Sequence, residues 1–266
     1  MDLWKYYHGD LKYPDITKYS HEKEIAKVTP RWAYEYAKKH GKDEELEPII
    51  STSTYYSYWY AKNILNAQPF PLGEKAIAKS SEYSYLYARE ILKKSFKMGE
   101  SAISKGTAEY SYYYAKNILK GPFELGEPAI AKDALYSYLY AKHILNEQPF
   151  KLGEKEIAKN AEYSYMYAHD ILKGPFKLGE KAIAKNAEYS YYYAKNILKG
   201  PFELGEPAIA KDALYSYIYA DEVLNGPFPL GEPAIAKDKR YSKEYTQYVL
   251  KKDFYLDGKL ICKYEG

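Results

Sequence analysis

Residues 180–200 read EKAIAKNAEYSYYYAKNILKG and contain every part of a unit that fills most of this 266-residue chain. The unit opens with Glu-x-x-Ile-[Ala/Ser] and continues with Tyr-Ser-Tyr-x-Tyr-Ala. Its first residue recurs every 25 to 27 residues, at Glu22, Glu47, Glu74, Glu100, Glu127, Glu154, Glu180, Glu206 and Glu232. This period is typical of stacked supersecondary units. The sequence therefore predicts an all-α protein, an α-solenoid of about nine helix-turn-helix repeats of 26 residues.

Each unit is expected to hold two helices. The first covers residues 180–185 and begins with Glu180, whose charge suits the helix dipole. Asn186 then serves as the N-cap of a second helix over residues 187–199, which stops at Gly200-Pro201. The nine residues at this N-cap position all belong to the N-capping types, namely Thr29, Ser53, Ser80, Thr107, Asp133, Asn160, Asn186, Asp212 and Asp238.

The second helix carries small residues on one face, because Ser190 and Ala194 lie close together at 100° per residue. Small side chains let neighbouring helices approach closely, so this face is expected to form the contact between units. The connection after the helix carries Phe202 and Leu204. Both are expected to be plugs under the next unit.

The two ends depart from the pattern, as terminal units of a repeat array do. Residues 1–21 are expected to form an N-terminal cap, residues 22–250 the nine-repeat array and residues 251–266 a C-terminal cap. Asp257-Gly258 is a hairpin turn signal between two apolar segments. It predicts a small β-hairpin in the C-terminal cap.

Composition excludes several classes of function. The net charge is only +3, which argues against a strongly basic nucleic-acid binder. The chain has one cysteine and no apolar run long enough to span a bilayer, so we expect a cytoplasmic protein. Its five histidines show no metal-ligand spacing and no catalytic constellation occurs. The sequence therefore favours a non-enzymatic protein without metal or cofactor.

Function is sought where the units differ, and one column of the second helix stands out. It holds a large apolar or aromatic side chain in all seven inner units, at Trp59, Leu86, Tyr113, Leu139, Met166, Tyr192 and Ile218. The two outer units have Glu35 and Glu244 instead. Either this apolar column packs between successive helices, or it is an exposed strip that binds a partner.

A second column lies beside it and is mostly basic, at Lys62, Arg89, Lys116, Lys142, His169 and Lys195. Basic side chains between aromatic ones can hold phosphates and stack bases, so a nucleic-acid or nucleotide binder is an alternative. The near-neutral total charge instead favours a solvated helix face with paired glutamates, at Glu82, Glu109, Glu162 and Glu188.

Units such as residues 129–154 resemble the tyrosine-rich repeats of uncharacterised proteins from tailed bacteriophages, giant viruses and some bacteria. The Tyr-x-Tyr-Ala and Gly-Pro-Phe elements carry this resemblance over roughly residues 22–250. In architecture the units are similar to TPR and HEAT repeats, although they are shorter. The resemblance implies a viral or virus-related origin and action on another macromolecule, and it transfers no catalytic residue.

Residues 108–141 match residues 187–220 with a single change, Leu139 to Ile218, which indicates copying of a three-unit block. An array that gains repeats by duplication can change its binding surface quickly, which fits a protein whose partner also changes. We therefore expect a repeat scaffold that binds a protein, such as a phage product that sequesters a host defence factor. A structural assembly component is a further alternative.

Overall fold

The computed structural model of this chain describes residues 21–266. The N-terminal cap predicted at residues 1–21 lies outside the described residues, apart from His21. Contacts divide the chain into two compact units, Met1–Gly126 and Glu127–Gly266, and each is described by itself below.

The first unit consists of helix pairs, and in every pair after the first the second helix changes from α-helical to π-helical, whereas α3 is α-helical throughout. The π-helical segments are η2, η3 and η5, and η4 and η6 are single 3₁₀ turns. The elements are α2 (Glu22–Ala26), α3 (Pro30–His40), α4 (Glu47–Ile50), α5 (Thr54–Trp59), η2 (Tyr60–Ile64), α6 (Pro71–Ile77), α7 (Ser81–Leu86), η3 (Tyr87–Leu92), η4 (Lys97–Gly99), α8 (Glu100–Lys105), α9 (Ala108–Tyr114), η5 (Ala115–Leu119) and η6 (Glu124–Gly126).

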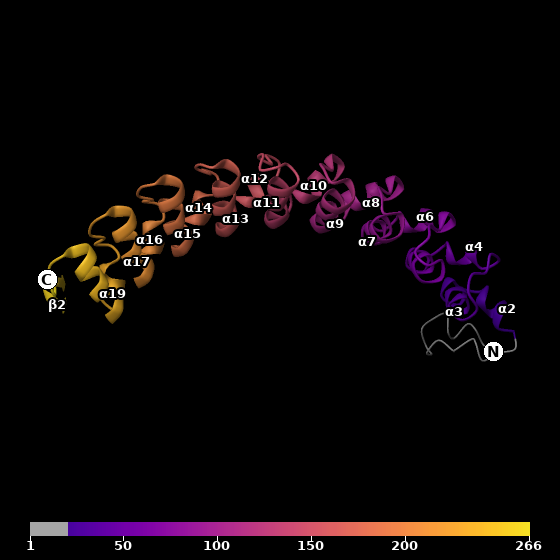
Figure 1. Cartoon of the computed structure of the whole chain (residues 1–266), viewed down its shortest axis with the longest axis horizontal. Coiled ribbons are helices and arrows are strands. Elements are labelled where there is room, and N and C mark those ends of the chain that lie inside the picture. The colour runs from indigo at the N-terminus through magenta and orange to yellow at the C-terminus, as the bar shows by residue number, and fades with distance from the viewer. Residues whose placement is uncertain (1–20) are drawn as a thin grey trace. The chain divides into compact units, whose positions relative to one another are not determined.

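The second unit continues the same pairs and ends in two strands. The successive second helices α11, α13, α15, α17 and α19 follow one another in chain order and pack side by side (Figure 1). The elements are α10 (Glu127–Ile130), α11 (Ala134–His143), α12 (Glu154–Ile157), α13 (Ala161–Met166), η7 (Tyr167–Leu172), α14 (Glu180–Ile183), α15 (Ala187–Tyr192), η8 (Tyr193–Leu198), α16 (Glu206–Ile209), α17 (Ala213–Tyr219), η9 (Ala220–Leu224), α18 (Glu232–Ile235), α19 (Lys239–Glu244), η10 (Tyr245–Leu250), β1 (Phe254–Leu256) and β2 (Lys259–Cys262).

The predicted helix pairs with a period of about 26 residues are confirmed. So is every predicted N-cap. Each of the nine side chains accepts a hydrogen bond from the backbone N–H three residues later, as Asn160 does from Tyr163 at 3.0 Å. These bonds satisfy N–H groups that the first turn of a helix leaves without a partner.

The second helices end one residue earlier than the sequence suggests. Where a glycine precedes proline, the residue before the glycine takes the left-handed conformation. These residues are Lys120, Lys173, Lys199 and Asn225, with φ between 50° and 53°. The glycine N–H then bonds to a carbonyl six residues earlier in the π-helical segment; that of Gly174 donates to the Ala168 carbonyl at 3.1 Å.

Repeats are joined by a buried tyrosine whose hydroxyl has two partners. The Tyr193 hydroxyl accepts from the Phe176 N–H at 3.0 Å and donates to Glu180 Oε1 at 2.9 Å. The Phe176 ring lies 5.1 Å from the Tyr167 ring of the preceding repeat. Phe176 is therefore held between the second helices of two repeats, and the hydroxyl explains why tyrosine rather than phenylalanine occupies the Tyr193 position.

The small face of the second helix meets the glycine of the following Leu-Gly-Glu turn. A Cβ built on Gly179 would lie 2.6 Å from Ser164 Cβ and 2.6 Å from the Phe176 ring, so no larger residue fits there. Ser164 is fully buried and donates to the Ile157 carbonyl at 2.9 Å. The serine of the small face thus packs on the turn that leads into the next unit, and the glycine leaves room for it.

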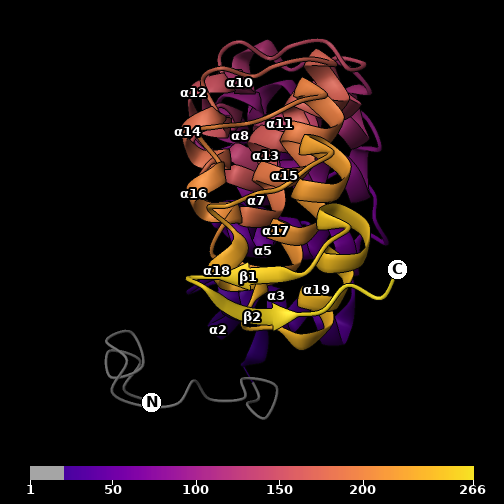
Figure 2. The same ribbon diagram turned by 90° about the vertical axis from the view of Figure 1, so that its left-hand side faces the viewer.

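The predicted C-terminal hairpin is confirmed. Strands β1 and β2 are antiparallel and joined by Asp257 and Gly258, both with positive φ. The hairpin lies against α19 (Figure 2). Phe254 is buried with its ring 5.4 Å from that of Tyr245, the position that Phe228 and its equivalents take in the repeats. The hairpin therefore covers the end of the second unit with the same phenylalanine contact that joins the repeats.

Candidate binding surfaces

The apolar column predicted to bind a partner is half-buried at all seven of its positions. Two of its three aromatic members pack on a tyrosine of the preceding repeat, whereas the Trp59 ring lies against Tyr55 and Tyr58 of its own helix. The Tyr113 ring lies 6.4 Å from the Tyr85 ring, and the Tyr192 ring lies 6.0 Å from that of Tyr165. The column is thus neither fully packed between successive helices nor a fully exposed strip, because part of each side chain is covered and part faces solvent. Its role in binding stays a prediction.

The glutamates that the two outer units carry at this position, Glu35 and Glu244, are paired with basic residues of their own helices. Glu35 accepts a hydrogen bond from Lys38 at 3.0 Å, and Glu244 accepts one from Arg240 Nε at 2.9 Å. Both carboxylates are therefore neutralised within their own helices rather than by a neighbouring repeat.

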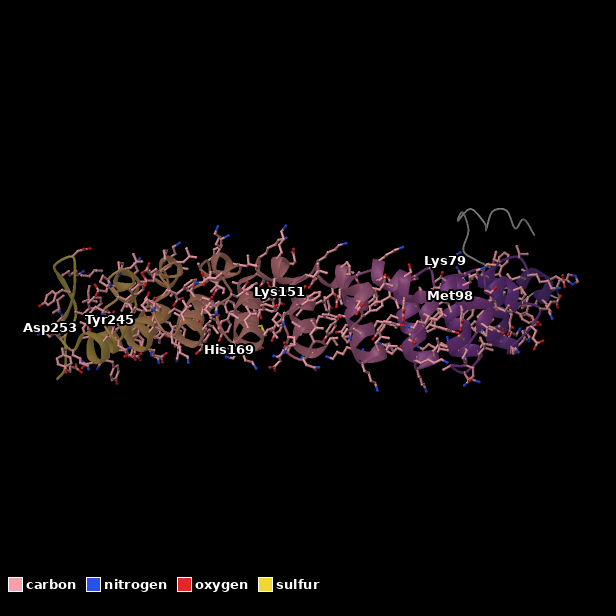
Figure 3. All side chains as sticks on the ribbon, turned by 90° about the horizontal axis from the view of Figure 1, so that it is seen from above. Lys79, Met98, Lys151, His169, Tyr245 and Asp253 are labelled. Carbon is pink, nitrogen blue, oxygen red and sulfur yellow. The ribbon has the colours of Figure 1, made fainter. Side chains whose placement is uncertain are left out.

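The basic column contributes to the junctions between repeats. Lys142 Nζ donates to the Tyr138 hydroxyl at 2.8 Å and to Asp170 Oδ2 of the next repeat at 2.7 Å. Lys62 and Lys195 make the same kind of ion pair with Glu90 and Glu222, at 2.7 Å each. The acids that meet these three lysines are thus not the glutamates expected from the sequence. Figure 3 displays the side chains of the described residues, with His169 of this column labelled.

These junction acids have shifted pKa values. Burial opposes ionisation of Asp170, but hydrogen bonds from His169, Lys142 and Tyr138 outweigh it and lower its pKa to about 2. The pKa of Glu90 is lowered to about 2 in the same way, because bonds from Lys62, Tyr58 and Arg89 outweigh burial. Both carboxylates are therefore ionised at neutral pH.

A second kind of junction uses asparagine. Asn117 Nδ2 donates to the Tyr85 hydroxyl at 2.9 Å, and Asn196 Nδ2 donates to the Tyr165 hydroxyl at 2.9 Å. The residue after the basic column thus decides whether the tyrosine hydroxyl of the preceding repeat donates to a carboxylate or accepts from an amide. This signal is visible in the sequence as an acid or asparagine at the second position after the Tyr-Ala pair, and sequence reasoning missed it.

The most exposed repeated apolar side chain lies outside both predicted columns. The residue before the glycine of each Leu-Gly-Glu turn is 52–62% exposed in seven repeats, at Leu72, Met98, Leu125, Leu152, Leu178, Leu204 and Leu230. The expectation that Phe202 and Leu204 are both plugs is therefore half wrong. Phe202 is buried at 4% exposure and packs on Tyr193, whereas Leu204 is turned to solvent at 52%.

Within residues 21–266, no three His, Cys, Asp or Glu side chains are arranged to hold a metal ion. In the same range no helix is long and apolar enough to cross a bilayer. No protein-family model, curated protein or solved structure matches the chain.

Proposed function

We propose that this chain is a non-enzymatic repeat scaffold that binds a protein partner. The observation that carries the proposal is the contrast between the interior and the surface of each repeat. Interior polar groups, such as the Tyr193 hydroxyl, the Glu180 carboxylate and the Ser164 hydroxyl, bond to other groups of the fold. At the surface one large apolar side chain per repeat stays more than half exposed in seven repeats. Exposed apolar side chains that gather into one patch mark interaction surfaces, and a side chain repeated along an array of units is placed to form such a patch.

The resemblance to tyrosine-rich viral and bacteriophage repeats supports a narrower version of this proposal. The partner would be a host defence factor that the repeats sequester, and the site of action would be the cytoplasm of the host cell. The internal duplication of residues 108–141 supports it too, because extra repeats extend a binding surface without disturbing the others.

Affinity purification tests the proposal. The tagged chain is recovered from cells of its natural host, and each captured component is then produced separately and titrated against the purified chain by calorimetry. A single protein that binds stoichiometrically in the titration supports the scaffold. Co-purified nucleotide or nucleic acid, with affinity falling steeply as salt is raised, would point to the Tyr/Lys columns instead. Self-association without a partner would indicate an assembly component.

A further inference from the structure

The exposed leucines of the second unit differ in their charged surroundings. Leu152 follows Lys151 and Leu178 follows Lys177, and these two lysine side chains are 76% and 77% exposed. Lys155 and Lys181, in the first turns of α12 and α14, are exposed as well. Further along the same unit, Glu203 and Pro229 take the place of these lysines before Leu204 and Leu230.

Glu154 and Glu180, two residues after Leu152 and Leu178, face inward, and Glu156 of α12 is paired with Lys159. Glu154 and Glu180 have side-chain exposures of 12% and 16%, and each accepts a hydrogen bond from a buried tyrosine, Tyr167 at 3.0 Å and Tyr193 at 2.9 Å. Each also pairs with the preceding lysine at 3.0 Å, but the ammonium group lies on the solvent side of the pair. The charge that this surface presents to a partner is therefore mainly positive.

The buried residues that join the Leu-Gly-Glu turn to the preceding repeat flank the exposed leucine. Contact with the preceding repeat is made by Phe176 and Gly179, which flank Leu178 in the chain and are both buried. The position before the exposed residue holds Lys, Glu or Pro in the seven copies, whereas the exposed position itself is always Leu or Met. An apolar side chain is thus kept at the surface while its neighbour in the sequence varies.

From these observations we infer that the surface formed by Lys151, Leu152, Lys155, Lys177, Leu178 and Lys181, the leucine–lysine strip, docks an acidic amphipathic helix of the protein partner. The inference rests on the proposed function and names its contact. Packed helices lie about 8–10 Å apart. Residues i and i+7 of a helix lie on one face about 10.5 Å apart. One apolar face of such a helix therefore contacts Leu152 and Leu178 together, while its acidic flanks meet the four lysines.

The test uses a defined probe, a fluorescein-labelled synthetic helix of about five turns. Leucines occupy positions i, i+3, i+4 and i+7 of one face and glutamates the flanks, and binding is followed by fluorescence anisotropy. A second peptide carries lysine in place of every glutamate. Vesicles of anionic phospholipid form a third arm, because exposed leucine and lysine also suit a membrane surface.

Three variants of the full chain are compared after circular dichroism has shown unchanged helix content. Leu152→Gln with Leu178→Gln removes the apolar contact. Lys155→Glu with Lys181→Glu reverses charge and leaves the Lys151–Glu154 and Lys177–Glu180 pairs in place. Leu204→Gln with Leu230→Gln is the matched control, because these leucines are equally exposed but lack the preceding lysines.

We expect the acidic peptide to bind the natural chain, and the first two variants to weaken it about tenfold, which corresponds to about 1.4 kcal/mol. The control pair should change affinity less than about twofold, within the scatter of neutral surface substitutions. Equal binding of the lysine peptide, binding only to vesicles, or no loss in the Leu152/Leu178 variant would each overturn the inference. A captured partner that binds this variant undiminished would overturn it too and leave the proposed function standing.

Discussion

Tyr193 shows how a single hydroxyl holds two repeats together. It is fully buried, and its oxygen accepts from the Phe176 N–H and donates to Glu180. Removing it leaves the buried Phe176 N–H without its acceptor, which is costlier than losing an ordinary hydrogen bond, and Glu180 keeps only its pair with Lys177. The residue next to it in the chain, Tyr192, is only half-buried.

We predict that Tyr193→Phe lowers the free energy of unfolding by about 1–3 kcal/mol. Tyr192→Phe should change it by less than about 0.5 kcal/mol, as most surface substitutions do. Urea unfolding followed by circular dichroism measures both. Equal effects of the two variants would mean that the two bonds of the Tyr193 hydroxyl contribute nothing specific.

Lys142 and Asp170 form an ion pair across the junction between two successive repeats. The pair is 2.7 Å long and partly buried, with exposures of 35% and 22%, and it also includes the Tyr138 hydroxyl. Pairs at the surface contribute little, but coupling grows when groups share hydrogen bonds in a common network.

A double-mutant cycle with Lys142→Met and Asp170→Asn should give a coupling energy of about 0.5–1.5 kcal/mol. Salt should reduce this coupling, because the pair is open to solvent on one side. The cycle is measured by urea unfolding at low and high sodium chloride concentration. Additive single effects would show that the contact does not stabilise the junction.

At the scale of the helices and turns, the glycines before proline and the glycines of the Leu-Gly-Glu turns have different surroundings. Gly179 lies in the turn before α14 and has no room for a side chain, since Ser164 and Phe176 would lie 2.6 Å from its Cβ. Gly174 lies after η7, where the nearest atom to a Cβ would be the Leu172 carbonyl oxygen at 3.7 Å. Its φ is not positive, because Lys173 takes the left-handed conformation.

We predict that Gly179→Ala destabilises the second unit by about 1–3 kcal/mol, the usual cost of overpacking a filled core. Gly174→Ala should leave stability unchanged or raise it by up to about 1 kcal/mol, since alanine restricts the unfolded chain. Thermal unfolding of the two variants side by side measures the difference. A destabilised Gly174→Ala would mean that this glycine, and not Lys173, carries the conformational requirement of the helix end.

The same elements show what could be predicted from sequence. The N-caps were predictable because capping is local: the side chain of Asn160 bonds to a backbone group three residues away. The exposure of Leu204 could not be predicted, because Phe202 and Leu204 are both apolar. The structure shows the Phe202 ring packed against Gly205 and Leu204 turned to solvent. The role of Glu180 was predicted in part, since its place at a helix start was recognised but its bond to Tyr193 spans two helices.

At the scale of the whole molecule, the tyrosine content makes stability depend on pH in the alkaline range. Burial first, and then hydrogen bonding to a carboxylate, raises the pKa of Tyr193 above its ordinary value, and its equivalents in other repeats, such as Tyr167 and Tyr245, are raised as well. Burial and Glu90 likewise raise the pKa of Tyr58 to about 12. The folded chain therefore keeps protons that the unfolded chain releases.

The sign of the effect follows from this difference. An unfolded tyrosine titrates near pH 10, so the stabilisation is fully present below about pH 10 and is lost as the pH rises toward the folded pKa. Each such tyrosine then lowers the free energy of unfolding by about 1.4 kcal/mol per pH unit. Because the tyrosine recurs in successive repeats, the slopes add and the chain should unfold abruptly under base.

Measuring tyrosinate absorbance and helical circular dichroism on the same alkaline titration tests this prediction. Ionisation of the buried tyrosines and loss of helix should coincide in one steep transition, and the urea midpoint should fall sharply from about pH 10 upward. Tyr193→Phe should make the fall shallower by about one proton. Complete ionisation near pH 10 with the helical signal intact would contradict the burial of these hydroxyls, and with it the account of how the repeats are joined.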